Sequence, residues 1–213
     1  MATIQQRNEE KRANYAEQKK RYASAFNGGY HLECIFISYA MIEDRILSIL
    51  THLRMVNVEN AKPSWRKSPK DCYEAYKRII RDCTKASDNL PQLRYLQTKL
   101  DALKALAEAG DADEDATFYE HWLRSTVRDR LRQSDVSALC DQLMSWKERR
   151  NELTHALFAL DRGNYSDGEF RRLAEEGMEL ARAFDNVSGQ MKTCERQFEK
   201  AWAAKCRAQA KNR

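Results

Sequence analysis

Three residues suited to phosphodiester chemistry lie close together in the segment 150–155, whose sequence is RNELTH. His155 has an ordinary pKa of about 6.5, so it can accept or donate a proton near neutral pH. Arg150 keeps its charge and can bind two phosphate oxygens at once. Asn151 and His155 are four residues apart, so on a helix their side chains share a face. We expect Arg150, Asn151 and His155 to line one cleft, where Asn151 would orient His155 or a phosphate.

A carboxylate, Glu43, is predicted to face this cation. It interrupts an apolar stripe in the segment 30–55, and Arg150 interrupts a second stripe four residues after Trp146. A charge on an apolar face is costly unless it is paired or reaches water. Two stripes interrupted by opposite charges therefore predict a pair between two helices, Glu43 with Arg150. The alternative is that Glu43 lies at the edge of its stripe and extends into solvent.

The remaining sequence predicts helices and no strand. Only 7 Gly and 3 Pro occur among 213 residues, and no alternation of apolar and polar residues bounded by turn signals indicates a strand. We predict an all-α, antiparallel bundle of about six or seven helices, because short loops between long helices make neighbours antiparallel. The predicted helices cover about residues 4–25, 30–55, 68–85, 91–110, 117–132, 134–160 and 166–208. The two stripes consist of Leu32, Ile35, Phe36, Tyr39, Ile42, Ile46, Leu50 and Leu53, and of Val136, Leu139, Leu143, Trp146, Leu153, Leu157 and Leu160.

Length and composition favour one intracellular domain. A chain of 213 residues fits a single sizeable core, so we predict one domain over residues 1–213. No apolar run reaches the roughly 18–20 residues of a membrane span, and the polar N-terminus is not a secretory signal. The six cysteines form no CxxC pair, and most are expected to be small buried residues in a reducing compartment. We predict a cytoplasmic protein with no cofactor, no metal and no membrane partner.

The net charge of +5 is concentrated at the C-terminus. Residues 192–213 contain seven basic residues and two glutamates, which together account for the whole excess. A basic helix of this kind can attract nucleic-acid phosphates. The alternative is a solvated helix end, where cations suit the helix dipole. Phe198 and Trp202, on the same segment, are expected to anchor the helix by packing rather than to stack on bases.

The segment 150–155 resembles the R-(N/D/H)-x3-H signature of the HEPN superfamily. HEPN domains are helical bundles, and many are metal-independent endoribonucleases that act as dimers in toxin–antitoxin, abortive-infection and CRISPR systems. A Glu from an earlier helix often faces the Arg of the signature, and Glu43 matches that position. The resemblance implies a HEPN-like core over about residues 29–160, between an N-terminal helix and a long basic C-terminal helix. It also implies a catalytic set of Arg150, Asn151, His155 and Glu43.

A second arginine–histidine spacing in the chain is assigned a structural role. Arg45 and His52 fit only the relaxed form of the signature, because Ile46 follows the arginine where a polar residue is expected. His121, among aromatic residues, is likewise expected to be a packed or surface histidine.

The resemblance implies cleavage of RNA without a metal. RNA carries its own nucleophile, the 2′-OH, so the protein must supply a base, an acid and a positive charge for the phosphate. One histidine cannot do both proton transfers, but a two-fold dimer brings two copies of His155 together. We therefore expect RNA as a partner, a homodimer, and products with a 2′,3′-cyclic phosphate and a 5′-OH. A toxin or phage-defence effector of this kind would also have an antitoxin or another regulatory protein as a partner.

Two alternatives remain from the sequence. The first is a non-catalytic HEPN-like module that binds a protein or nucleic-acid partner, in which Arg150 and Glu43 form a structural salt bridge. The second is an unrelated helical bundle with a scaffolding role. Exposure of His155 discriminates between these interpretations, because a nuclease requires it at a surface and a structural role does not.

Overall fold

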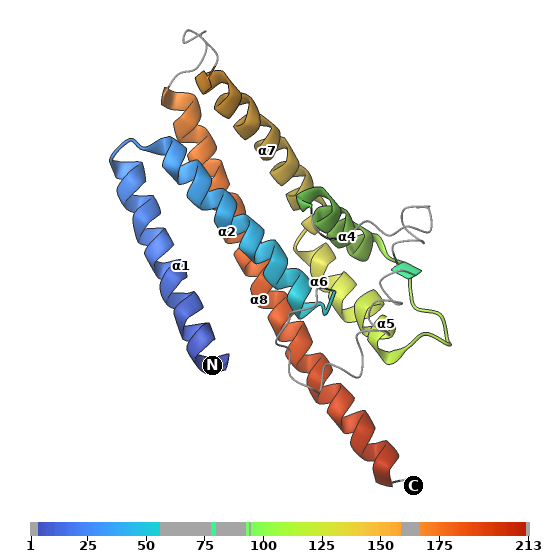
Figure 1. The fold of residues 1–213 in the computed structure, drawn as a ribbon. Coiled ribbons are helices and arrows are strands. Elements are labelled where there is room, and N and C mark those ends of the chain that lie inside the picture. Colours follow the sequence, from blue (N-terminus) through green and yellow to red (C-terminus); the bar gives the residue numbers. More distant parts are fainter. Residues whose placement is uncertain (1–3, 56–77, 80–92, 94, 159–166, 212–213) are drawn as a thin grey trace. The chain divides into compact units, whose positions relative to one another are not determined.

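Every regular element of the structure is a helix in the ranges that it describes, which are residues 4–55, 78–79, 93, 95–158 and 167–211 of a computed structural model (Figure 1). The predicted all-α fold is therefore confirmed. The helices are α1 (Ile4–Asn27), α2 (His31–His52), α4 (Leu96–Glu108), α5 (Phe118–Trp122), α6 (Arg128–Gln133), α7 (Val136–Phe158) and α8 (Asp167–Lys211). The long C-terminal helix is confirmed as well, since α8 has 45 residues.

The helix boundaries follow the predicted signals closely. A π-helical stretch, Leu123–Val127, joins α5 to α6, so the predicted helix over 117–132 is continuous. The predicted helix over 68–85 lies outside the described residues, apart from Arg78 and Ile79, which are helical. Cys72, Cys83 and Leu160 also lie outside them. In the part of the chain that is described, no helix is long and apolar enough to cross a membrane.

The chain forms two compact units, and their boundaries fall inside α2, α7 and α8. Unit 1 consists of residues 1–42 and 145–182, and unit 2 consists of residues 43–144 and 183–213. Each unit therefore draws its helices from distant parts of the sequence. The prediction of a single domain stays a prediction.

Unit 1 begins with an antiparallel pair of helices, the whole of α1 and the first half of α2. Gly29 makes the turn between them with a positive φ of 78°, a conformation that glycine adopts without steric cost. The Tyr15 hydroxyl donates to the Met41 carbonyl at 3.0 Å, and the Tyr22 hydroxyl donates to the carbonyl of Ala174 on α8 at 2.9 Å. Burial is the main cause that raises the pKa of Tyr22 to about 12, so its hydroxyl stays a donor.

Trp146 of α7 fills the centre of unit 1. Its side chain is only 1% exposed, and its indole Nε1 donates to the Leu173 carbonyl of α8 at 2.8 Å. The indole lies so close to Gly177 that a Cβ atom there would be 2.6 Å from Trp146 Cζ2. The absence of a side chain at Gly177 therefore allows α8 to approach the ring.

Unit 2 is built around the second half of α2 and the second part of α8. Its buried residues include Ile46, Ile49, Leu50 and Leu53 of α2, and Phe184, Met191, Cys194 and Phe198 of α8. The Tyr119 hydroxyl donates to the Leu53 carbonyl at the end of α2. Arg132 of α6 binds the Ala107 carbonyl at 2.6 Å, at the C-terminal end of α4. Such side chains satisfy carbonyls that a helix end leaves without partners.

One predicted core residue is misplaced. Phe36 was expected in the apolar stripe of α2, but its side chain is 51% exposed. The buried face of α2 passes through Ile35 and Ile42, and consecutive residues on a helix point about 100° apart. Phe36 therefore faces outward although its spacing from neighbouring apolar residues fits the stripe. The described part of the second stripe, Val136, Leu139, Leu143, Trp146 and Leu153, is buried as predicted.

The cysteines behave largely as predicted. Cys34, Cys140 and Cys194 are buried free thiols, whereas Cys206 is exposed. Burial raises the pKa of all three buried thiols, that of Cys140 to about 12. These three residues therefore act as small apolar side chains.

The tight contact at Gly177 predicts opposite effects of alanine at two glycines of α8. Gly177→Ala should destabilise the protein by about 1–3 kcal/mol, because a rigid indole cannot yield to the new methyl group. Gly189→Ala should stabilise it by up to about 1 kcal/mol, because a Cβ there meets nothing within 4 Å and alanine favours helix. Urea denaturation followed by circular dichroism measures both, and equal effects at the two positions would contradict this account of the packing.

Candidate functional site

Helix α7 places Arg150, Asn151 and His155 on consecutive turns of unit 1. His155 is exposed, whereas Arg150 and Asn151 are half-buried. Leu153, which lies between Asn151 and His155 in the sequence, is buried and so packs this part of α7 against the rest of unit 1. The Thr154 hydroxyl donates to the Arg150 carbonyl at 2.8 Å, so it is satisfied within the helix. The local helix is thus intact and carries all three predicted site residues, of which Arg150 and Asn151 are joined by hydrogen bonds.

The guanidinium of Arg150 is held by two neighbours. Its Nε and Nη2 atoms donate to Asn151 Oδ1 at 3.2 and 2.7 Å, and its Cζ lies 4.0 Å from the ring centroid of Tyr39. Tyr39 in turn stacks on Trp146, with ring centroids 6.3 Å apart and planes inclined by 19°. The cation is therefore the outer layer of a stack that begins in the core of unit 1.

These contacts reveal one role and one residue that the sequence did not predict. The Asn151 carbonyl oxygen binds Arg150, whereas the helical spacing suggested His155 or a phosphate as its partner. Tyr39 supports the guanidinium by a cation–π contact, yet it lies more than a hundred positions earlier in the sequence. Its only sequence signal was an aromatic residue within the apolar stripe of α2.

Glu43 is half-buried and is the first residue of unit 2. Because Arg150 belongs to unit 1, the pairing of Glu43 with Arg150 stays a prediction. The structural role assigned to Arg45 and His52 agrees with their contacts in unit 2. Arg45 pairs with Asp185 at 2.9 Å, and His52 Nδ1 lies 2.7 Å from Glu195 Oε2.

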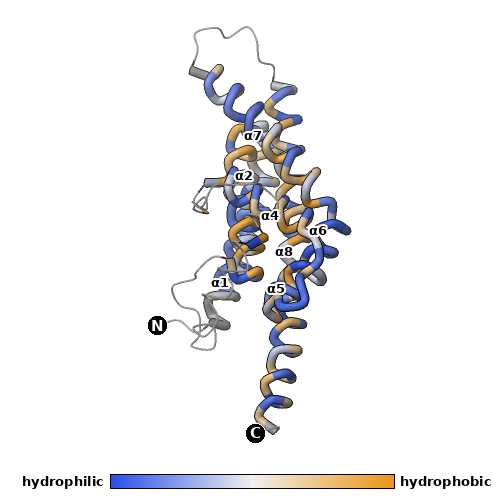
Figure 2. Tube along the Cα trace, turned by 90° about the vertical axis from the view of Figure 1, so that its right-hand side faces the viewer, coloured by the Kyte–Doolittle hydropathy of each residue, from blue (hydrophilic) through white to orange (hydrophobic). Residues whose placement is uncertain are grey.

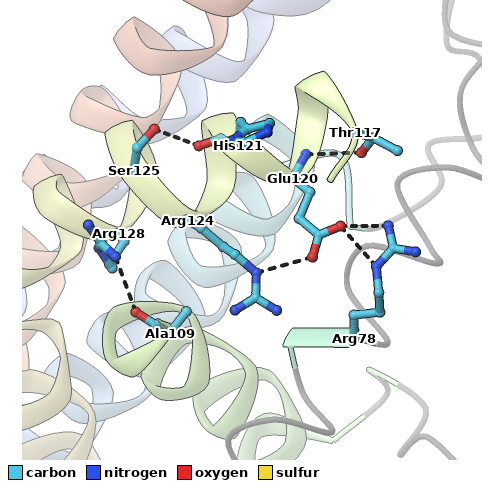
Figure 3. A network of polar contacts seen from close by, with 8 residues as sticks. All are labelled: Arg78, Ala109, Thr117, Glu120, His121, Arg124, Ser125 and Arg128. Atoms are coloured by element: carbon cyan, nitrogen blue, oxygen red, sulfur yellow. Dashed lines mark hydrogen bonds and ion pairs between the residues drawn. The ribbon is translucent and has the colours of Figure 1, made fainter. Parts of the chain in front are cut away.

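A second polar site in unit 2 was missed by the sequence analysis. Glu120 and Arg124 are 3% and 6% exposed, and Figure 3 shows the Glu120 carboxylate between two guanidinium groups. Arg124 Nε donates to Glu120 Oε1 at 3.1 Å, and Arg78 Nε donates to Oε2 at 2.9 Å. Thr117 caps the N-terminal end of α5, because its hydroxyl oxygen accepts a hydrogen bond from the Glu120 backbone N–H. From the sequence alone, the Glu120–Arg124 spacing was that of an ordinary surface pair.

The geometry of this second site indicates a structural role. Both carboxylate oxygens of Glu120 are bound by arginines, so the charge is compensated where water is excluded. The π-helical stretch Leu123–Val127 begins directly before Arg124. Glu120 and Arg124 are both buried, in contrast to the exposed His155, whereas Arg78 is half exposed.

No protein-family model, curated protein or solved structure matches this chain. The resemblance of the segment 150–155 to HEPN domains therefore stays a prediction.

The buried pair predicts a large stability effect at Glu120. Glu120→Ala leaves the buried Arg124 without its carboxylate, so the free energy of unfolding should fall by about 3–5 kcal/mol. A matched control is Glu175→Ala, which breaks an exposed pair with Arg171 of the same i,i+4 spacing and should cost about 0.5 kcal/mol or less. Urea unfolding measures both variants. A loss at Glu120 no larger than that at Glu175 would contradict the account of Glu120 as a buried structural charge.

Proposed function

We propose that this protein is a metal-independent endoribonuclease of the HEPN type, with Arg150, Asn151 and His155 as its catalytic residues. The observation that carries the proposal is the exposure of His155 one turn after Asn151, the residue whose side chain holds the Arg150 guanidinium. An exposed imidazole can reach a substrate, and a guanidinium held by Tyr39 and Asn151 is already positioned to bind a phosphate.

The reaction would be an internal transfer at phosphorus. The 2′-oxygen of RNA attacks the adjacent phosphorus, the new P–O2′ bond forms, and the P–O5′ bond breaks. One imidazole takes the proton from the 2′-OH, and another donates a proton to the leaving 5′-oxygen. Arg150 stabilises the negative charge that grows on the phosphate oxygens. The products are a 2′,3′-cyclic phosphate and a 5′-OH.

Two imidazoles at one phosphate require two copies of the chain. An isologous dimer brings the same surface of each subunit together. The exposed side chain of Phe36 lies three residues from Tyr39 on α2, and therefore near Arg150 within unit 1. Aromatic residues are enriched in protein–protein interfaces relative to the rest of the surface. We assign Phe36 to the dimer contact.

The proposed setting is the cytoplasm, where a toxin or phage-defence nuclease would meet its RNA. The three buried free thiols fit a reducing compartment. A nuclease with a preformed site would also need control by an antitoxin or another regulatory protein.

The central test is cleavage of RNA in excess EDTA. The wild-type protein should cut single-stranded RNA and leave 2′,3′-cyclic phosphate ends, and His155→Ala should lower the rate by about 100-fold or more, because it removes general acid–base catalysis. His121→Ala is the matched control, since His121 is also exposed but lies on α5 of unit 2. Gel analysis of end-labelled RNA measures both rate and product ends.

Two outcomes would contradict the nuclease proposal. Equal cleavage by the wild type and His155→Ala would identify a contaminating activity. Absence of cleavage by a folded, dimeric wild-type protein would favour the non-catalytic module, in which Arg150, Tyr39 and Trp146 form only a packing stack.

The proposed dimer predicts a specific effect of a charge at Phe36. Phe36→Asp should convert the dimer to a monomer and lower cleavage about as much as His155→Ala, because the composite site no longer forms. Tyr95→Asp is the control, since Tyr95 is an exposed aromatic residue of unit 2. Sedimentation equilibrium gives the mass of each variant. A Phe36→Asp protein that stays dimeric would remove Phe36 from the interface, and an active monomer would refute the composite site.

A further inference from the structure

One face of the C-terminal part of α8 carries only positive charges among its ionisable residues. Lys192, Arg196, Lys200 and Arg207 follow one another at helical spacings of four, four and seven residues, and all four are exposed. At 100° per residue they fall within a sector of about 80°, and they extend over about 22 Å of the helix axis. We call these four residues the basic stripe. In Figure 2, hydrophilic positions recur along these turns of α8.

The acidic residues of the same segment do not neutralise the stripe. Glu195 binds His52 at 2.7 Å, and Glu199 binds Arg54 at 3.4 Å, so both glutamates are paired with residues at the end of α2. Within the described part of unit 2, no member of the stripe takes part in an ion pair. The positive charge of this face is therefore left to solvent or to a ligand.

Packing on the opposite side fixes the direction in which the stripe points. Phe198 is buried, with its ring centroid 4.7 Å from that of Trp122 and 5.5 Å from that of Phe118. Trp202, one turn later, lies 5.5 Å from Phe118. Phe198 thus anchors the helix as the sequence predicted, whereas Trp202 packs on Phe118 but leaves 45% of its surface exposed. From Glu199 to Ala210 every residue is exposed, so these turns of α8 are open to a partner.

We infer that the basic stripe binds the phosphate backbone of single-stranded RNA, independently of sequence; the choice of RNA as the polyanion rests on the proposed function. Regularly spaced cations along a straight rod match a ligand that carries a charge on every residue, and two of the four are arginines, which bind phosphate oxygens with two donors. No aromatic residue lies within the stripe to stack on a base. This surface contains none of the proposed catalytic residues, so it is a binding function beyond the cleavage reaction.

The test is fluorescence anisotropy with a labelled 2′-O-methyl oligoribonucleotide of about 20 nucleotides. This probe lacks the 2′-OH nucleophile, so the proposed nuclease cannot cut it and binding is measured alone. The triple variant Arg196→Ala/Lys200→Ala/Arg207→Ala should bind at least tenfold more weakly at 0.1 M salt. The slope of log affinity against log salt should become shallower by about 2, because each lost phosphate contact contributes about 0.7 for a single strand.

The matched control removes the same charge from another exposed helix. Arg12→Ala/Lys19→Ala/Lys20→Ala changes three exposed basic residues of α1 in unit 1 and should leave affinity within about twofold of the wild type. The probe cannot be cleaved, which separates this inference from the nuclease proposal. Circular dichroism checks that both triple variants keep their helix content.

Three results would overturn the inference. The first is equal affinity of the stripe variant and the wild type for the oligonucleotide. The second is an equal loss of affinity in the α1 control, which would show that the effect depends only on net charge. The third is no binding of the oligonucleotide together with stripe-dependent binding to vesicles of 30% phosphatidylserine, which would identify a lipid-binding face instead. If the protein binds the oligonucleotide through the stripe but does not cleave RNA, the binding inference is supported and the nuclease proposal is contradicted.

Discussion

The burial of Trp146 against Gly177 is the constraint on which the candidate site depends. The indole is fixed by a hydrogen bond to the Leu173 carbonyl and by the close approach of α8. Tyr39 stacks on the indole, and the Arg150 guanidinium stacks on Tyr39. A cation at the surface is thereby fixed by the packing of the core, so that it does not lose side-chain freedom when it meets an anion. Asn151 completes the arrangement from the same helix.

The two units show different uses of charge. In unit 2, the buried Glu120 carboxylate binds the buried Arg124 and the half-exposed Arg78, so its charge is compensated. In unit 1, Arg150 is held by an aromatic face and a neutral amide, neither of which cancels its charge. On the basic stripe of α8, the exposed cations are not neutralised by the nearby glutamates, because Glu195 and Glu199 bind His52 and Arg54. In the last two arrangements no ion pair joins the cations to a carboxylate within the described part of their own unit, whereas in the first a carboxylate binds both arginines.

The sequence predicted what depends on local periodicity and missed what depends on contacts between helices. The helices of the described ranges, the stripe of α7 and the anchoring role of Phe198 follow from spacing along a single helix. The prediction that Phe36 is buried was wrong, because the spacing of apolar residues does not show where the buried face of a helix ends. Glu120 was missed because its i,i+4 arginine suits a surface as well as a core, and only the packing of α5 distinguishes the two. Tyr39 was missed as a partner of Arg150 because the cation–π contact joins residues far apart in sequence.

The composition of unit 1 has a consequence for biosynthesis. Its N-terminal helices, residues 1–42, pack with residues 145–182, and about a hundred residues separate the two segments. The chain emerges from the ribosome with its N-terminus first, so buried residues such as Ile35 and Met41 are synthesised well before the segment 145–182 of the same unit. Unit 1 therefore has a high contact order, which slows folding. The part of the protein that carries the exposed histidine and its arginine is completed only after residues 43–144, which belong to unit 2, have been synthesised.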